Sequence, residues 1–255
     1  MATMSHIPSI DLHVHTLHSD GVSGVVDVIR QAETNELEAV AITDHHHMIG
    51  IEGITSYARE IREMSKGVPM MVLVGLEIHP REDLSLPHID KGVNGIDLIL
   101  ADPLGEGVDA INGLGKEEAL DHFARTYGII CENPEIDIIE HPLNLGRFEQ
   151  FKLFSDVDPW LLDHLIKGAK RGNKCLEVMS GMSWWYPKSK VDRFTCEYAA
   201  FIRQALDEGV KVSIGSDAHC VHGVGNIRWS HKVLNEAGAT ADDVIDISAK
   251  GKLWK

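Results

Sequence analysis

Short apolar runs alternate with longer amphipathic stretches along the 255-residue chain. The runs with the length and composition of β-strands lie at 10–15, 39–43, 70–77, 96–101, 136–141, 174–178 and 211–215. Between them, apolar residues recur with helical spacing near 22–35, 51–64, 116–130, 159–171 and 192–208. Seven strands that alternate with helices predict an α/β fold with a parallel sheet, either open and doubly wound or closed into a barrel.

Most of the predicted strands end in residue types that bind metal ions. The motifs are Asp11-Leu12-His13-Val14-His15, Thr43-Asp44-His45-His46, Gly75-Leu76-Glu77, Glu140-His141-Pro142 and Gly215-Ser216-Asp217-Ala218-His219, with Ser19-Asp20-Gly21 following the first. In parallel α/β folds the carboxyl ends of the strands converge on one face, so these residues are expected to meet. Because side chains alternate along a strand, His13 and His15 should point the same way.

Each motif alone also has a structural explanation. The pair of His residues on the first strand is a weak signal, and Thr43 or Asp44 fits the N-cap of a helix. The segment 215–219 fits an ordinary loop between a strand and a helix. Buried acids and imidazoles without partners are costly, however. Five clusters at five strand ends therefore favour a metal site.

Composition narrows the functional classes. The formal charge of −15 disfavours a large nucleic-acid interface, because phosphate backbones are bound by Lys and Arg. No apolar run approaches the length of a membrane span, and no basic-then-apolar signal sequence begins the chain. The four Cys residues form no CxxC pair, which is typical of reduced thiols. These features predict a cytoplasmic protein without a membrane partner.

Taken in order, the strand-end motifs resemble those of the PHP family (polymerase and histidinol phosphatase). The resemblance extends from about residue 8 to the C-terminus. It implies an α/β fold, a distorted (β/α)7 barrel that forms a single domain over residues 1–255. It also implies three divalent metal ions, of which Zn²⁺, Mn²⁺ and Fe²⁺ suit a mixed set of imidazoles and carboxylates.

Carried onto this chain, the resemblance implies nine metal ligands. The first ion would be held by His13, His15, Glu77 and Asp217, the second by Glu77, His88 and His141, and the third by Asp20, His45 and His219. His79 is the alternative to His88. We prefer His88 because its run, Pro87-His88-Ile89, resembles that of the family.

The chemistry that such a centre suits is hydrolysis of a small phosphorylated metabolite or nucleotide, as in a histidinol phosphatase, by a metal-activated hydroxide. Asp44 and His219 are candidates for proton transfer. Arg147 is a candidate for contact with the phosphate, and Trp184 and Trp185 for an aromatic wall. The alternative activity is that of an amidohydrolase acting on C–N bonds.

Overall fold

Seven parallel strands form one sheet whose spatial order follows their order in the chain. The computed structural model describes residues 6–104 and 111–248. The strands are β1 (Ile10–Asp11), β2 (Ala39–Ile42), β3 (Met71–Ile78), β4 (Leu98–Ala101), β5 (Ile138–Ile139), β6 (Cys175–Met179) and β7 (Val212–Gly215). Every neighbouring pair in this order is parallel, so the connections must return each strand to the same end of the sheet.

The first and last strands meet and nearly close the sheet into a barrel. The Leu12 backbone N–H donates to the carbonyl of Ile214 at 2.8 Å. Beyond the strands, Val14 and Ala218 form a parallel bridge. The prediction of a distorted (β/α)7 barrel is therefore confirmed, and the open, doubly wound sheet is excluded.

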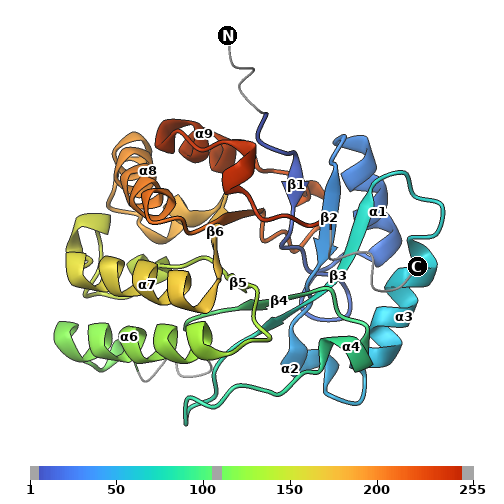
Figure 1. Ribbon diagram of the computed structural model, residues 1–255, viewed down its shortest axis with the longest axis horizontal. Helices are drawn as coiled ribbons and strands as arrows, with labels where there is room; N and C mark the ends of the chain where they lie inside the picture. Colours follow the sequence, from blue (N-terminus) through green and yellow to red (C-terminus); the bar gives the residue numbers. More distant parts are fainter. Residues whose placement is uncertain (1–5, 105–110, 249–255) are drawn as a thin grey trace.

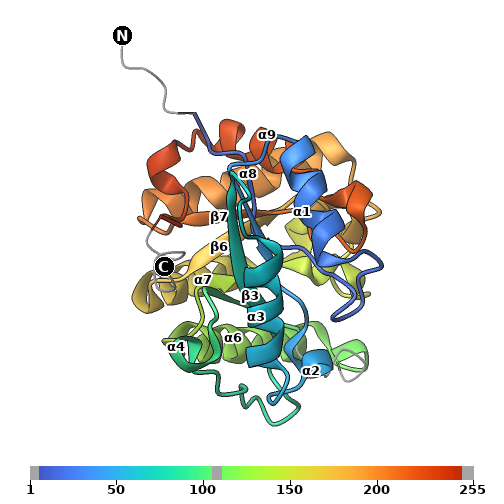
Figure 2. The same cartoon turned by 90° about the vertical axis from the view of Figure 1, so that its right-hand side faces the viewer.

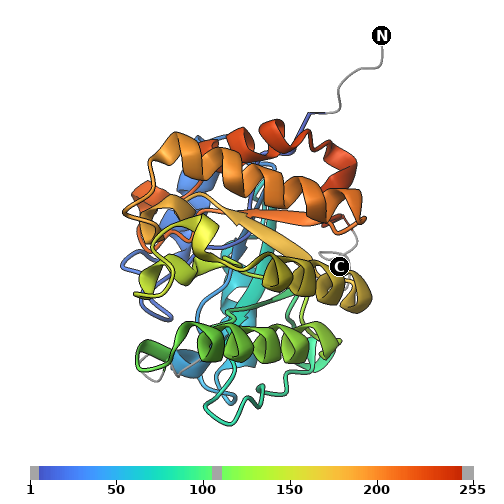
Figure 3. The same ribbon diagram turned by 90° about the vertical axis from the view of Figure 1, so that its left-hand side faces the viewer.

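Helices cover the outside of the sheet (Figure 1). The longer ones are α1 (Val25–Thr34), α3 (Ile54–Met64), α6 (Lys116–Glu132), α7 (Pro159–Gly172), α8 (Val191–Asp207) and α9 (Arg228–Ala237). Two short helices, α2 (His46–Ile49) and α4 (Lys91–Asn94), lie in connections. Helix α3 packs against β3 with its axis nearly aligned with the strand (Figure 2), and α6, α7 and α8 lie side by side (Figure 3).

The strands are short and almost completely buried, as expected for a parallel sheet that is covered by helices. Their apolar side chains join those of the helices in one continuous core. The loops that follow the strands carry the polar residues, and several of these are also buried. No helix in the described part of the chain has the length and apolar character that crossing a membrane requires.

Candidate metal centre

His13 and His15 lie on an extended segment just after β1. The bridge between Val14 and Ala218 keeps this segment straight, so the two imidazoles project to the same side. Their Nε2 atoms are 3.1 Å apart, and both side chains are buried. Two ring nitrogens aimed at one point can share only one proton, whereas a cation can accept both lone pairs.

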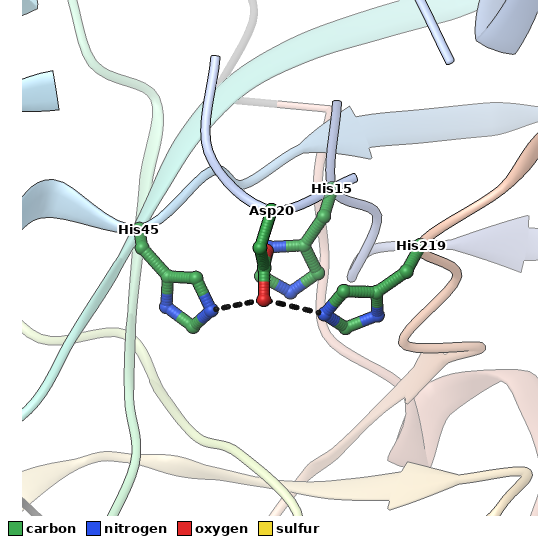
Figure 4. Close-up of side chains that lie close together, drawn as sticks. All are labelled: His15, Asp20, His45 and His219. Atoms are coloured by element: carbon green, nitrogen blue, oxygen red, sulfur yellow. Dashed lines mark ion pairs between the residues drawn. The ribbon is translucent and has the colours of Figure 1, made fainter. Parts of the chain in front are cut away.

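Three other side chains surround the outer side of His15 (Figure 4). Asp20, His45 and His219 each offer a ligand atom within 4.8 Å of one another and of His15. The Asp20 Oδ2 atom lies 3.4 Å from His45 Nε2 and 3.2 Å from His219 Nε2. The group is assembled from the loops after β1, β2 and β7, and it opens to solvent because Asp20 is exposed and His219 is partly exposed.

Two further groups of ligand atoms lie on the inner side of His15, and both include the imidazole of His13. Their members are His13, Glu77, Glu140 and His141 in one, and His13, His15 and Asp217 in the other. Glu77 Oε2 lies 3.2 Å from His13 Nε2 and 3.0 Å from His15 Nε2. Because His13 and His15 belong to more than one group, the three groups adjoin and form one centre.

The charges of the inner groups call for a cation. Burial, and then the negative charge of Glu77, raise the pKa of Glu140 well above its ordinary value. Burial alone would lower the pKa of His15, but hydrogen bonds with Asp217 and Glu77 raise it to about 9. Both Glu140 carboxylate oxygens are buried and have no hydrogen-bond partner among the described residues. Divalent ions would satisfy these oxygens and offset the acidic charge, so the residues fit a metal centre.

A buried carboxylate on β6 links two of these groups from behind. Glu177 Oε1 lies 2.9 Å from His13 Nδ1, and its Oε2 accepts the His141 backbone N–H at 2.6 Å. A carboxylate that accepts a hydrogen bond from Nδ1–H keeps the proton on that nitrogen and leaves the Nε2 lone pair free to bind a metal. Gly215 makes room for this contact, because a Cβ atom there would lie 2.0 Å from Glu177 Oε1.

Two residues of the centre adopt strained backbone conformations. Asp217 has a φ of 56° and His141 a φ of 22°, both in the region that favours glycine. Strain of this kind persists when the surrounding structure holds it in place. Hydrogen bonds do so here: the Asp217 N–H donates to the His13 carbonyl, and the His141 N–H is held by Glu177.

The structure brings together eight of the nine ligands expected from the sequence. These are His13, His15, Asp20, His45, Glu77, His141, Asp217 and His219. His88 is not among them. It is exposed and lines a separate hollow with Leu86 and Ile129. His79, the alternative, also lies outside the three groups and contacts His47.

Two acids occupy the side of the centre where His88 was expected. Glu140 belongs to the same group as Glu77 and His141. Asp102, directly after β4, places its Oδ1 atom 3.8 Å from His141 Nδ1. The sequence analysis names neither acid as a ligand. Glu140 lies inside the motif Glu140-His141-Pro142, and Asp102 directly follows a predicted strand, which is the position that indicated the other ligands.

The residues expected to take part in catalysis have different surroundings. His219 is in the outer group. Asp44 is fully buried, and its carboxylate accepts hydrogen bonds from Thr16 and Ser19 at 2.6 to 2.7 Å, so it holds the loop after β1. Tyr57 in turn accepts the Asp44 backbone N–H.

Arg147 and one of the two Trp residues lie next to the centre. The Arg147 guanidinium stands over the Trp185 ring, 5.3 Å from its centroid. Trp185 meets the His141 ring edge-on, with centroids 5.1 Å apart. Trp184, by contrast, is 77% exposed. The loop after β6 therefore contributes one aromatic side to the centre, and the stack brings Arg147 beside it.

Comparisons with known proteins identify the family of the chain. The family model named PHP domain matches residues 11–180, and the chain belongs to this family. A protein of Thermoanaerobacter sp. (strain X514) named "Probable phosphatase" is 26% identical over 244 residues, which are 93% of this chain and 89% of that protein. The DNA polymerase/3'-5' exonuclease PolX of Bacillus subtilis is 23% identical over 82% of this chain but 34% of its own length.

Among solved structures, a two-domain protein from Bacteroides vulgatus contains a predicted PHP-like metal-dependent phosphoesterase. It matches with a TM-score of 0.44 and 16% identity, over 87% of this chain and 57% of that one. Family membership, together with the site, defines the class of the protein: a metal-dependent phosphoric ester hydrolase.

Proposed function

We propose that the chain hydrolyses a small phosphorylated metabolite or nucleotide at a centre of three divalent metal ions. The observation that carries this proposal is the gathering of three adjoining groups of ligand atoms, each within 4.8 Å, from strand β3 and from the connections after β1, β2, β5 and β7. The outer ion would be held by His15, Asp20, His45 and His219. The inner ions would be held by His13, Glu77, Glu140, His141 and Asp217, with Asp102 beside them.

When bound, such ions supply positive charge for the phosphoryl oxygens and lower the pKa of a coordinated water. The residues of the chain do the rest. Water adds its oxygen to phosphorus, the phosphorus–oxygen bond to the alcohol breaks, and the alcohol leaves with a proton. The Nε2 atom of His219 would hold the outer ion, and its Nδ1 atom lies 3.0 Å from the Asp217 carbonyl oxygen, so this imidazole has no nitrogen left for that proton. Water at the open side of the centre, where the His219 side chain is 42% exposed, can supply it. Zn²⁺, Mn²⁺ and Fe²⁺ all suit this ligand set.

Arg147 supports the choice of a phosphate ester as substrate. Its position over Trp185 keeps a guanidinium near the inner groups, where it can pair with a phosphate oxygen. The positive charge of Arg147 also acts on the nearby carboxylate of Asp102. The net charge of −15 favours a small substrate over a polymeric nucleic acid.

The test combines metal content with phosphate release. The purified protein should contain close to three divalent ions per chain and release phosphate from a panel of phosphomonoesters and nucleotides. Removing the ions with a chelator should abolish turnover, and adding Mn²⁺ or Zn²⁺ should restore it. Glu77→Gln should lose ions and at least 100-fold in activity, whereas Glu63→Gln, an exposed control on α3, should match the wild type. Turnover of amides alone would instead support the amidohydrolase activity.

A further inference from the structure

A small hollow lies next to the metal centre, on the side of His45. Its volume is about 180 Å³, and it is lined by His46, His47, Gly50, Ile78, His79, Arg81 and Pro87. These residues come from α2 and the residue after it, and from the end of β3 and the chain that follows, so they flank the same strand ends that supply His45 and Glu77. The His47 ring lies 5.2 Å from the His45 ring, which makes the hollow and the outer metal group direct neighbours.

The lining is rich in groups that attract an anion. None of the seven lining residues is acidic, although the chain as a whole carries a charge of −15. The lining includes the guanidinium of Arg81 and three imidazoles. The Nε2 atom of His46 is buried and makes no hydrogen bond to any described residue.

A fourth metal ion fits this hollow less well than an anion does. His79 Nε2 and His47 Nδ1 lie 2.9 Å apart and form a hydrogen bond with each other, which occupies one nitrogen of each ring. Arg81 has no lone pair to give to a metal and would repel a cation. A guanidinium beside imidazole N–H groups is instead the arrangement that binds phosphate or carboxylate oxygens.

We propose that this hollow binds a second anionic group, a phosphate or a carboxylate, of the same substrate whose phosphate ester reacts at the metal centre. The volume is below the roughly 300 Å³ of pockets that hold a whole drug-sized molecule, so one such group fills it. The inference rests on the proposed phosphoesterase function and specifies which substrates the enzyme prefers. The substrate is a short molecule with two anionic ends, one at His45 and one at Arg81.

The experiment compares esters that differ only in the second anion. The metal-loaded enzyme is assayed with alkanediol bisphosphates and with ω-phosphooxy carboxylates of three to six carbons, each against the alkyl monophosphate of the same length. We expect kcat/KM for the best dianionic chain length to exceed that of its matched monophosphate at least tenfold. The preferred series tells phosphate from carboxylate, and the preferred length measures the spacing between the two sites.

Arg81→Met keeps the length of the side chain and removes its charge. In this variant the preference should fall to threefold or less, while kcat/KM for the alkyl monophosphates stays within twofold of wild type. Arg30→Met, an exposed control on α1, should leave the preference intact. Thermal unfolding of each variant separates lost binding from lost folding.

Three results would overturn the proposal: no preference at any chain length, an equal loss for both substrate series in Arg81→Met, or a further metal ion that is lost in His46→Asn. If no ester at all is hydrolysed, the phosphoesterase function fails, and calorimetry still tests the hollow. Alkane bisphosphonates should then bind at least tenfold more tightly than the matched monophosphonates, and Arg81→Met should remove the difference. Equal binding of both would refute the hollow as an anion site.

Discussion

Replacing Glu177 by Gln should weaken metal binding at the inner groups by about 10- to 100-fold, which is the usual effect of changing a residue that orients a ligand imidazole. The substitution preserves shape and removes one acceptor. The Glu177 carboxylate accepts two hydrogen bonds, one from His13 Nδ1–H at 2.9 Å and one from the His141 backbone N–H at 2.6 Å. A Gln side chain offers one acceptor oxygen and one donor NH₂ group, so it can satisfy only one of the two.

Either orientation of the amide harms the centre. If the NH₂ group faces His13, the imidazole must carry its proton on Nε2, and that atom can no longer bind a metal. If the NH₂ group faces the His141 N–H, a buried donor is left without an acceptor, which costs about 1–3 kcal/mol. At 1.4 kcal/mol per factor of ten, this corresponds to roughly 5- to 150-fold in affinity, in agreement with the general expectation.

The assay is a titration with buffered Zn²⁺ or Mn²⁺, followed by metal content and by phosphate release. Glu177→Gln should need a higher free metal concentration for half-maximal activity, and excess metal should recover part of the rate. Glu208→Gln, whose carboxylate pairs with Lys170 on the surface, is the matched control and should titrate as wild type. If Glu177→Gln retains wild-type metal affinity and stoichiometry, the argument from the imidazole tautomer is refuted.

Three further predictions follow from the same geometry. Asp102→Asn should lower the metal content and reduce activity at least tenfold. His88→Ala should stay within twofold of wild type in both measurements. The reverse result would support His88 as a ligand. Gly215→Ala should lower the free energy of unfolding by about 1–3 kcal/mol, because the new Cβ atom meets Glu177. Gly128→Ala, inside α6 and with open space around it, should instead raise the free energy of unfolding by about 0.5–1 kcal/mol. Denaturant unfolding measures both. Removing the metal should lower Tm, because the buried carboxylates then repel one another, and readdition of Mn²⁺ should reverse the change; an unchanged Tm would contradict the need for a cation.

The strands were predictable because each is a buried apolar run between polar loops. Their ends were not, since pairing depends on neighbours that are remote in sequence. The segment 10–15 was predicted as strand, but β1 pairs only over Ile10–Asp11, and the rest is an extended segment bridged at Val14. Helix α9 (Arg228–Ala237) was missed, although its buried residues recur with helical spacing and Gly238 ends it with a φ of 70°.

In the metal centre, too, local sequence patterns were predictable and contacts between remote residues were not. Imidazoles at strand ends are rare enough in ordinary loops to be recognised, and His13, His15, His45, His141 and His219 all meet at the centre. The choice of His88 rested on its place along the chain. The loop that carries it runs away from the strand ends, and nothing in its local sequence reveals that direction.

Acidic residues are harder to assign than His, because an acid at a strand end can either bind a metal or accept hydrogen bonds from a neighbouring loop. Asp44 and Glu140 both follow strands and are both fully buried. The Asp44 carboxylate accepts three hydrogen bonds from the loop at Thr16 and Ser19, whereas the two oxygens of Glu140 have no hydrogen-bond partner among the described residues. The number of hydrogen bonds that each carboxylate oxygen accepts distinguishes an acid that holds a loop in place from an acid that is free to bind a metal. That count exists only in the folded chain, which is why Asp44 and not Glu140 was selected from the sequence.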